Sequence, residues 1–260
     1  MIELRSPQEI EQMMPAGKFV GQVLLACKEA AKPGVNLLEL DALAHKMITE
    51  RGAQSCYIDY HPSFGAMPFG KVICTSVNDA VLHGLPYDYV LQDGDLLSID
   101  FACSVNGWVS DSAISFVVGK QADADRLAAD TKLIRTTEIA LEAGIAAAVT
   151  GNKIGDISNA IAQVAHQSGY SINTDFGGHG VGRTMHGEPH VPNNGRPGRG
   201  FKLRPGLVIA IEPWFLETTD EIYTDPDGWT LRSVDGSRGA HSEHTIAITA
   251  DGPLILTARD

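Results

Sequence analysis

Cysteine is scarce in this sequence, and long apolar segments are missing. The 260 residues include four cysteines, and no two of them form a C-x-x-C pair. The absence of such a pair excludes zinc fingers and thioredoxin-like redox motifs. A chain of this length folds without disulfide bonds, so reduced thiols are expected. No run of 18 apolar residues and no apolar N-terminal signal segment occurs. The sequence therefore predicts a soluble, cytoplasmic protein without membrane spans.

Positive charge is also in short supply. Twenty Lys and Arg residues stand against 32 Asp and Glu residues, so the net charge is -12. This balance argues against general binding of nucleic acids. A basic patch interrupts it in a Gly/Pro-rich stretch and consists of Arg196, Arg199, Lys202 and Arg204. Such a patch is either a solvated loop or a contact for an anionic partner.

Capping signals predict four helices. The segment 6–9 reads Ser-Pro-Gln-Glu, a capping box with proline at the first helical position, and predicts a helix that runs to about Ala31. A second helix is expected from about Leu37 to Arg51, where Gly52 stops it. Two more are expected at about 123–149 and 154–168.

Strands are expected in the middle and near the end of the chain. Asn-Gly at 106–107 separates two strand-like runs, 96–105 and 108–118, and is the strongest short signal for a β-hairpin. Further strands are predicted at 207–212 and 243–249.

The same order of features occurs twice along the chain. The matching pairs are segment 34–52 with 151–169, His83 with His186, Asp100 with Glu212, and Asp111 with Glu243. We expect two αβ halves, about 1–120 and 121–260, related by a pseudo-twofold axis within one α+β domain that spans 1–260. Two copies are a duplication, since a solenoid needs three or more units.

The predicted hairpin brings two acids together. A two-residue turn sets Val105 opposite Trp108 and Ala102 opposite Asp111. Asp100 and Ala102 share a face, so Asp100 and Asp111 become diagonal neighbours, roughly 7–8 Å apart at Cα. Two buried carboxylates repel each other and are costly to desolvate unless a cation joins them.

The repeat adds Glu212 and Glu243, so four carboxylates meet near the pseudo-twofold axis. Four buried carboxylates call for about two divalent ions, as in two-metal hydrolases with ions roughly 3.5–4 Å apart. His179 has no counterpart in the repeat, and imidazole with carboxylates suits Mn, Fe, Co or Zn better than Ca or Mg. Any one of these residues alone is more often a cap or a structural histidine. Their joint occurrence in matching places favours a metal centre.

The combined motifs resemble the type I methionine aminopeptidases of peptidase family M24, and the resemblance covers essentially the whole chain. The segments that carry it are 98–100, Asp111, 178–182, 211–213 and 243–245. The resemblance implies the pita-bread fold. It also implies hydrolytic removal of the initiator methionine from nascent proteins with a small second residue, by a hydroxide bound to two divalent ions.

The resemblance also implies roles for single residues. Asp100, Asp111, His179, Glu212 and Glu243 match the metal ligands, with Asp111 and Glu243 bridging both ions. Glu212 also matches the residue proposed as general base. His83 and His186 match two histidines that contact the substrate and assist the reaction.

Further positions resemble the family's binding sites. The lining of the methionine pocket is matched by Tyr60, His61, Cys74 and Trp229, and a monovalent-cation site by Asn78. In this family the basic patch would meet the negatively charged ribosome. A monomer is expected.

Two departures from the family pattern concern the pocket. Met185 stands where many members carry an aromatic residue, and the stretch 63–70 is longer than in short bacterial members. Either is expected to alter pocket width and peptide-length preference.

Two alternatives remain at the level of sequence. Xaa-Pro aminopeptidases and dipeptidases of the same fold usually carry an additional N-terminal domain, and the capping box at Ser6 leaves no room for one. Type II enzymes insert a subdomain between the histidine and glutamate motifs, but only 32 residues separate His179 from Glu212. Some pita-bread proteins have lost metal ligands and bind partners instead, whereas all five positions are occupied here.

Overall fold

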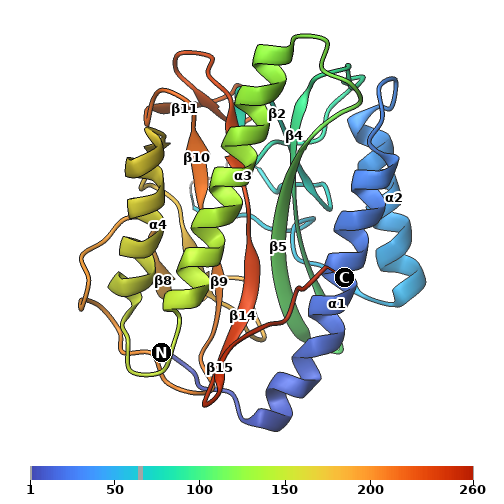
Figure 1. The fold of residues 1–260 in the computed structure, drawn as a ribbon. Coiled ribbons are helices and arrows are strands. Elements are labelled where there is room, and N and C mark those ends of the chain that lie inside the picture. The colour runs from blue at the N-terminus through green and yellow to red at the C-terminus, as the bar shows by residue number, and fades with distance from the viewer. Residues whose placement is uncertain (1, 64–66, 260) are drawn as a thin grey trace.

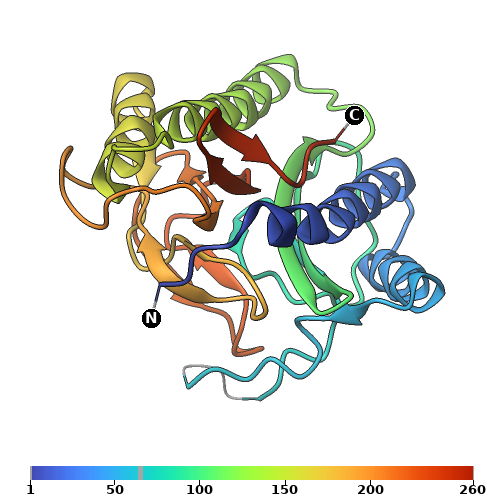
Figure 2. The same cartoon turned by 90° about the horizontal axis from the view of Figure 1, so that it is seen from below.

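Two pairs of helices pack side by side against a set of antiparallel strands (Figures 1 and 2). The structure, a computed structural model, describes residues 2–63 and 67–259. The helices α1 (Pro7–Ala30) and α2 (Leu37–Arg51) form one pair, and α3 (Ala124–Ala147) and α4 (Ile154–Ser168) form the other. The helices thus begin and end within two residues of their predicted bounds. Among the described residues, no helix is long and apolar enough to cross a membrane.

The predicted helix caps are present. The Ser6 hydroxyl accepts a hydrogen bond from the Glu9 amide at 3.2 Å, and the Ser6 amide donates to the Glu9 carboxylate at 2.8 Å. These two bonds satisfy amides that the first helical turn leaves without partners. Gly52 and Gly169 end α2 and α4 in the left-handed conformation, with φ of 66° and 77°, which glycine adopts without steric cost.

The repeat is visible in the bounds of the elements. An offset of 117 residues maps α1 onto α3, α2 onto α4, and β1 (Gln54–Ser55) onto β6 (Ser171–Ile172). Each helix pair covers its own apolar core, one beneath α1 and α2 and one beneath α3 and α4.

The predicted hairpin is confirmed in its register. Strands β4 (Leu96–Val105) and β5 (Trp108–Val117) pair with Val105 opposite Trp108 and Ala102 opposite Asp111. Both turn residues have positive φ, 53° at Asn106 and 74° at Gly107, which matches the right-handed twist of the strands. Strands β2 (Cys74–Val77) and β1 pair with the other edge of β4, β2 at residues 97–100 and β1 at residues 103–104.

The second half forms a five-stranded sheet. Its order is β15 (Gly252–Ile255), β14 (His244–Thr249), β9 (Val208–Ile211), β7 (Gly178–Gly180) and β8 (Gly187–Val191). Glu212 and Glu243 lie just outside the strands predicted to contain them, at the end of β9 and the start of β14. The sequence analysis did not predict β15.

Two small sheets surround the ends of the central strands. One contains β13 (Gly239–His241), β10 (Trp214–Leu216) and β6, and the other contains β11 (Ile222–Thr224), β12 (Leu231–Ser233) and β3 (Ala80–Leu82). Their strands are two or three residues long, too short for a periodic pattern to predict.

Candidate metal centre

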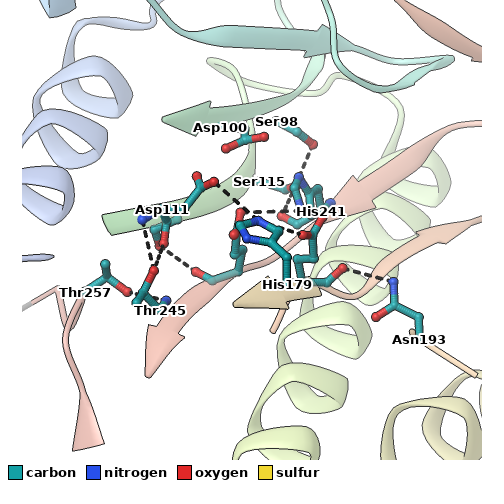
Figure 3. Close-up of polar contacts among 12 residues, drawn as sticks. Ser98, Asp100, Asp111, Ser115, His179, Asn193, His241, Thr245 and Thr257 are labelled. Carbon is teal, nitrogen blue, oxygen red and sulfur yellow. Dashed lines mark hydrogen bonds and ion pairs between the residues drawn. The ribbon is translucent and has the colours of Figure 1, made fainter. Parts of the chain in front are cut away.

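Five side chains converge where the two halves meet, and Figure 3 labels Asp100, Asp111 and His179 among them. Asp100 and Asp111 come from the hairpin, His179 from β7, and Glu212 and Glu243 from the facing ends of β9 and β14. Their ligand atoms form two overlapping triads within 4.8 Å, Asp100–Asp111–Glu243 and His179–Glu212–Glu243. Asp111 also groups with His179 and His186. Asp111, His179 and Glu243 each belong to two of these groups, so the three groups overlap in one cluster.

His179 is oriented by the backbone. Its Nδ1 lies 3.1 Å from the Gly180 carbonyl, which can only accept, so Nδ1 carries the proton in that hydrogen bond. Nε2 is then left to face the acids, 3.7 Å from Asp111 Oδ2 and 3.5 Å from Glu212 Oε1. This tautomer is the one in which an imidazole binds metal through Nε2.

The missing partner of His179 in the repeat is a serine. In the first half, Ser76 on β2 lies opposite Ser98 on β4. The offset of 112 maps Ser98 to Ala210, and continuing the β7–β9 pairing from Gly180 and Ile209 places His179 opposite Ala210. His179 therefore occupies the place of Ser76, so the first half has a hydroxyl where the second half has an imidazole.

Without a cation, burial disfavours the ionised form of the four acids. Burial raises the pKa of Glu212 to about 8 and that of Asp100 to about 6. Burial and the neighbouring acids raise the pKa values of Asp111 and Glu243 well above their usual range. Divalent ions would remove this penalty by stabilising the ionised forms, so the donor set fits them.

His241 is a further buried group at the acids that the sequence analysis missed. Its Nε2 lies 3.8 Å from Glu212 Oε2 and 3.9 Å from Glu243 Oε2, and it has no hydrogen-bond partner among the described residues. His241 stands two residues before Glu243, so the two-residue period of a strand could have indicated a shared face.

Tyr57 also contacts the acids and was not predicted as a site residue. The Tyr57 hydroxyl donates to Asp100 Oδ1 at 2.8 Å and lies 3.4 Å from Asp111 Oδ1. It thereby ties together the two acids of the hairpin. Tyr57 sits between β1 and β2 outside any regular element, so no periodic signal pointed to it.

Metal removal is expected to make stability fall as pH rises. The folded-state pKa values of Glu212 and Asp100 are raised, so the native protein holds protons that the unfolded chain releases between about pH 4 and pH 8. Thermal unfolding of chelator-treated protein should show a Tm that drops by several degrees from pH 5 to pH 8. Saturating Mn²⁺ should restore the Tm at pH 8. A pH-independent Tm without metal would contradict the raised pKa values.

The acids open into a cavity of about 530 Å³. Asp100, Asp111, His179, Glu212 and Glu243 form its floor. The other lining residues are Tyr57, Tyr60, Phe69, Cys74, His83, Asp175, Phe176, Gly177, Met185, His186, His190 and Trp229. Of these, Phe69, Asp175, Phe176 and His190 were not among the predicted site residues.

Two histidines stand over the acids from opposite halves. His83 has a φ of 54° and packs edge-on against Phe176, with ring centroids 4.8 Å apart. The Nδ1 of His186 lies 2.9 Å from the Tyr60 hydroxyl, and its ring packs against that of His179 at 4.4 Å. Burial lowers both pKa values to about 4, so each imidazole is neutral at pH 7.

The predicted pocket residues divide into two groups. Tyr60, Cys74 and Trp229 line the cavity, and the Trp229 indole donates to the Met67 carbonyl at 3.1 Å. His61 is exposed and lies outside the cavity lining, so its contact with substrate stays a prediction. In the stretch 63–70, residues 64–66 lie outside the described part of the chain.

Asn78 adopts a left-handed conformation with φ of 57°. Its amide donates to Asp95 at 2.9 Å, and its side-chain oxygen accepts from the Leu96 amide at 2.9 Å. Its backbone carbonyl accepts from the Gly239 amide at 3.2 Å. The monovalent cation at this position stays a prediction.

The basic patch is exposed. Arg196, Arg199, Lys202 and Arg204 all reach the solvent. The loop itself is held against the start of α4, because the Gly155 amide donates to the Arg199 carbonyl at 2.9 Å.

Four carboxylates, three of them buried, and one imidazole, shared between two αβ halves of a pita-bread fold, define a metal-dependent hydrolase. The sequence matches the metallopeptidase family M24 over residues 11–250. The chain belongs to this family.

Curated relatives match at full length. The chain is 44% identical over 258 residues to the methionine aminopeptidase of Clostridium perfringens, with 99% of each chain covered. It is 42% identical over 259 residues to that of Aquifex aeolicus, with 98% of each covered. The relationship therefore extends well beyond the metal ligands.

Solved structures agree. The methionine aminopeptidase of Rickettsia prowazekii superposes with a TM-score of 0.93 at 34% identity, covering 99% of this chain and 100% of that one. The prolidase of Pyrococcus furiosus reaches a TM-score of 0.75 at 21% identity, and this chain covers 66% of its length. The second likeness reflects the shared fold alone.

Proposed function

We propose that this protein is a methionine aminopeptidase that removes the initiator methionine from new chains whose second residue is small. The observation that carries the proposal is one cavity that joins the five acid and imidazole ligands to an apolar pocket. The full-length similarity to methionine aminopeptidases supports the same activity. The cytoplasm, where new chains emerge, is the proposed location.

Different residues of the chain take different roles in the proposed reaction. Two divalent ions, when bound, supply Lewis acidity and an activated water near neutral pH. The Glu212 carboxylate lies beside His179 and takes up a proton at Oε, and burial suits it for this role by raising its pKa to about 8. The neutral His83 and His186 hydrogen-bond the peptide from two sides.

The pocket suits a thioether side chain. Tyr60, Phe69 and Trp229 form an aromatic wall, with Phe69 and Trp229 edge-to-face at 5.1 Å between centroids. Met185, which is 8% exposed, adds a polarizable and adaptable side chain to the lining. A flexible wall at this place should tolerate variation in the first residue of the substrate better than a rigid ring.

A peptide assay tests the proposed activity. The metal-free protein would be incubated with Mn, Co, Fe or Zn and the peptide Met-Ala-Ser, with Ala-Pro-Ser as the comparison. Cleavage of Met-Ala-Ser is expected, and the most active ion would identify a working metal. Cleavage of the proline peptide alone would favour the Xaa-Pro branch, and no cleavage with any ion would refute the enzyme.

The exposed basic patch is proposed to meet the ribosome, whose surface is negatively charged. Replacing Arg196, Arg199, Lys202 and Arg204 by glutamate should reduce co-pelleting with ribosomes several-fold at low salt. Hydrolysis of a free tripeptide should be unchanged. If the variant pellets like the parent protein, the patch is a solvated loop.

A further inference from the structure

The C-terminal tail, residues 256–259, runs behind the metal centre. Figure 2 shows the end of the chain lying between α1 and α3. Helix α1 makes room for it with glycine: a Cβ at Gly17 would lie 2.1 Å from the Leu256 carbonyl oxygen, and one at Gly21 would lie 3.1 Å from that of Ala258. The Leu256 amide donates to the Thr245 carbonyl at 2.9 Å. The tail is thus an integral part of the packing.

The backbones of both bridging acids are held by hydroxyl groups. The Thr245 hydroxyl accepts from the Asp111 amide at 2.9 Å and donates to the Asp111 carbonyl at 2.8 Å (Figure 3). The Ser112 hydroxyl donates to the Glu243 carbonyl at 2.5 Å. Each hydroxyl belongs to the strand of one bridging acid and holds the backbone of the other, so the two halves are joined at the ligands themselves.

The tail forms hydrogen bonds to both of the residues that supply these hydroxyl groups, Thr245 and Ser112. The fully buried Thr257 hydroxyl lies 2.8 Å from His244 Nδ1 and accepts from the Thr245 amide at 3.1 Å. Arg259 Nη1 donates to the Ser112 hydroxyl at 2.6 Å, and Nη2 lies 3.4 Å from His244 Nε2. A guanidinium can only donate, so His244 accepts at Nε2 and donates from Nδ1 to Thr257. With this tautomer of His244, each hydrogen bond between Arg259, His244 and Thr257 has one donor and one acceptor.

The position of Arg259 is unusual for a cation. Its side chain is half-buried, and its hydrogen bonds go to a hydroxyl, a carbonyl and an imidazole, with no carboxylate among them in the described residues. A half-buried cation without a carboxylate partner loses part of its hydration, and the negative charge of the nearby acid cluster offsets that cost.

We propose that Arg259 and Thr257 are positioning residues that hold the bridging ligands Asp111 and Glu243 at the separation that a two-ion centre requires. The proposal rests on the proposed dinuclear hydrolase. Groups that orient metal ligands through hydrogen bonds commonly change metal affinity or activity by about tenfold to a hundredfold.

Titration of the metal-free full-length protein with Mn²⁺ tests this. The variants are Arg259→Met, which keeps the aliphatic stem, Arg259→Lys, which keeps the charge, and Thr257→Val, which keeps the shape. Arg51→Met, at an exposed arginine near the end of α2, is the matched control. Calorimetry would measure the affinity of each ion, and a Met-Ala-Ser assay at saturating Mn²⁺ would measure kcat and KM.

Arg259→Met and Thr257→Val are expected to bind at least one ion about tenfold to a hundredfold more weakly and to lose kcat, with KM within about twofold. Arg259→Lys should recover part of both, and Arg51→Met should match the parent protein. Parental affinity and kcat in both Met and Val variants, or a loss confined to the Tm of the metal-free protein, would overturn the proposal. If Arg259→Met does not fold, Thr257→Val decides alone. A parent protein that binds two ions but cleaves no methionine peptide refutes the proposed function and leaves the titration readable.

Discussion

Asp111→Ala is expected to abolish peptide hydrolysis and to remove bound metal. Asp111 is shared between ligand groups on both sides of the centre, so its loss takes a donor from both ions at once. We expect kcat/KM to fall by more than about a thousandfold, since both the activated water and the Lewis acid depend on the ions. Metal analysis after dialysis should find less than one ion per chain in the variant and two in the parent protein.

Two further variants separate charge from shape. Asp111→Asn keeps the volume and an oxygen that can accept from Tyr57, but it removes the negative charge. It should lose metal and activity to a similar extent, because ion binding requires the carboxylate charge. Asp251→Ala, at an exposed turn, is the control and should behave like the parent protein. Two bound ions together with parental activity in Asp111→Ala would exclude Asp111 as a bridging ligand.

His83 should have the opposite profile, with metal retained and turnover lost. His83 lines the cavity but belongs to none of the ligand groups among the described residues. Burial keeps it neutral by lowering its pKa to about 4, so it can hydrogen-bond the substrate. Removing such a group costs about a hundredfold or more in kcat. Metal analysis and steady-state kinetics on His83→Asn would check this, with two ions and a KM within a few-fold of the parent value expected.

Asparagine is the suitable replacement at His83 because of the backbone conformation there. At His83 φ is 54°, a left-handed conformation that asparagine tolerates and alanine resists by about 1 kcal/mol. His83→Ala should therefore show the same kinetic loss as His83→Asn with a lower Tm. Equal metal loss in His83→Asn and Asp111→Ala would refute the separation of substrate contacts from metal ligands.

Local chemistry accounts for the elements that could be predicted. The capping box at Ser6 and the stop at Gly52 mark helix ends through hydrogen bonds that involve only neighbouring residues. The Asn-Gly turn determines the register of the hairpin, and that register alone places Asp100 beside Asp111. Short strands such as β10 and β13 escaped prediction because their pairing depends on distant segments.

The site residues likewise divide into those that the sequence predicted and those that depend on contacts between distant segments. Repetition within the sequence was enough to pair Asp100 with Glu212, Asp111 with Glu243 and His83 with His186, and the resemblance to a known family added the roles expected of the two histidines. Tyr57 was missed because it lies outside any regular element, and His241 was missed although it stands two residues before Glu243. The contacts of Arg259 likewise depend on how the end of the chain packs against α1.

The sequence by itself determined the helices, the hairpin register, the duplicated order of the chain and the identities of five candidate ligands. Only the tertiary structure decided how these side chains meet, which tautomer His179 adopts and which polar groups hold the backbones of Asp111 and Glu243. The physical reason is the range of the interactions. Caps and tight turns act over a few residues, whereas burial and charge at the centre arise from segments brought together from both halves.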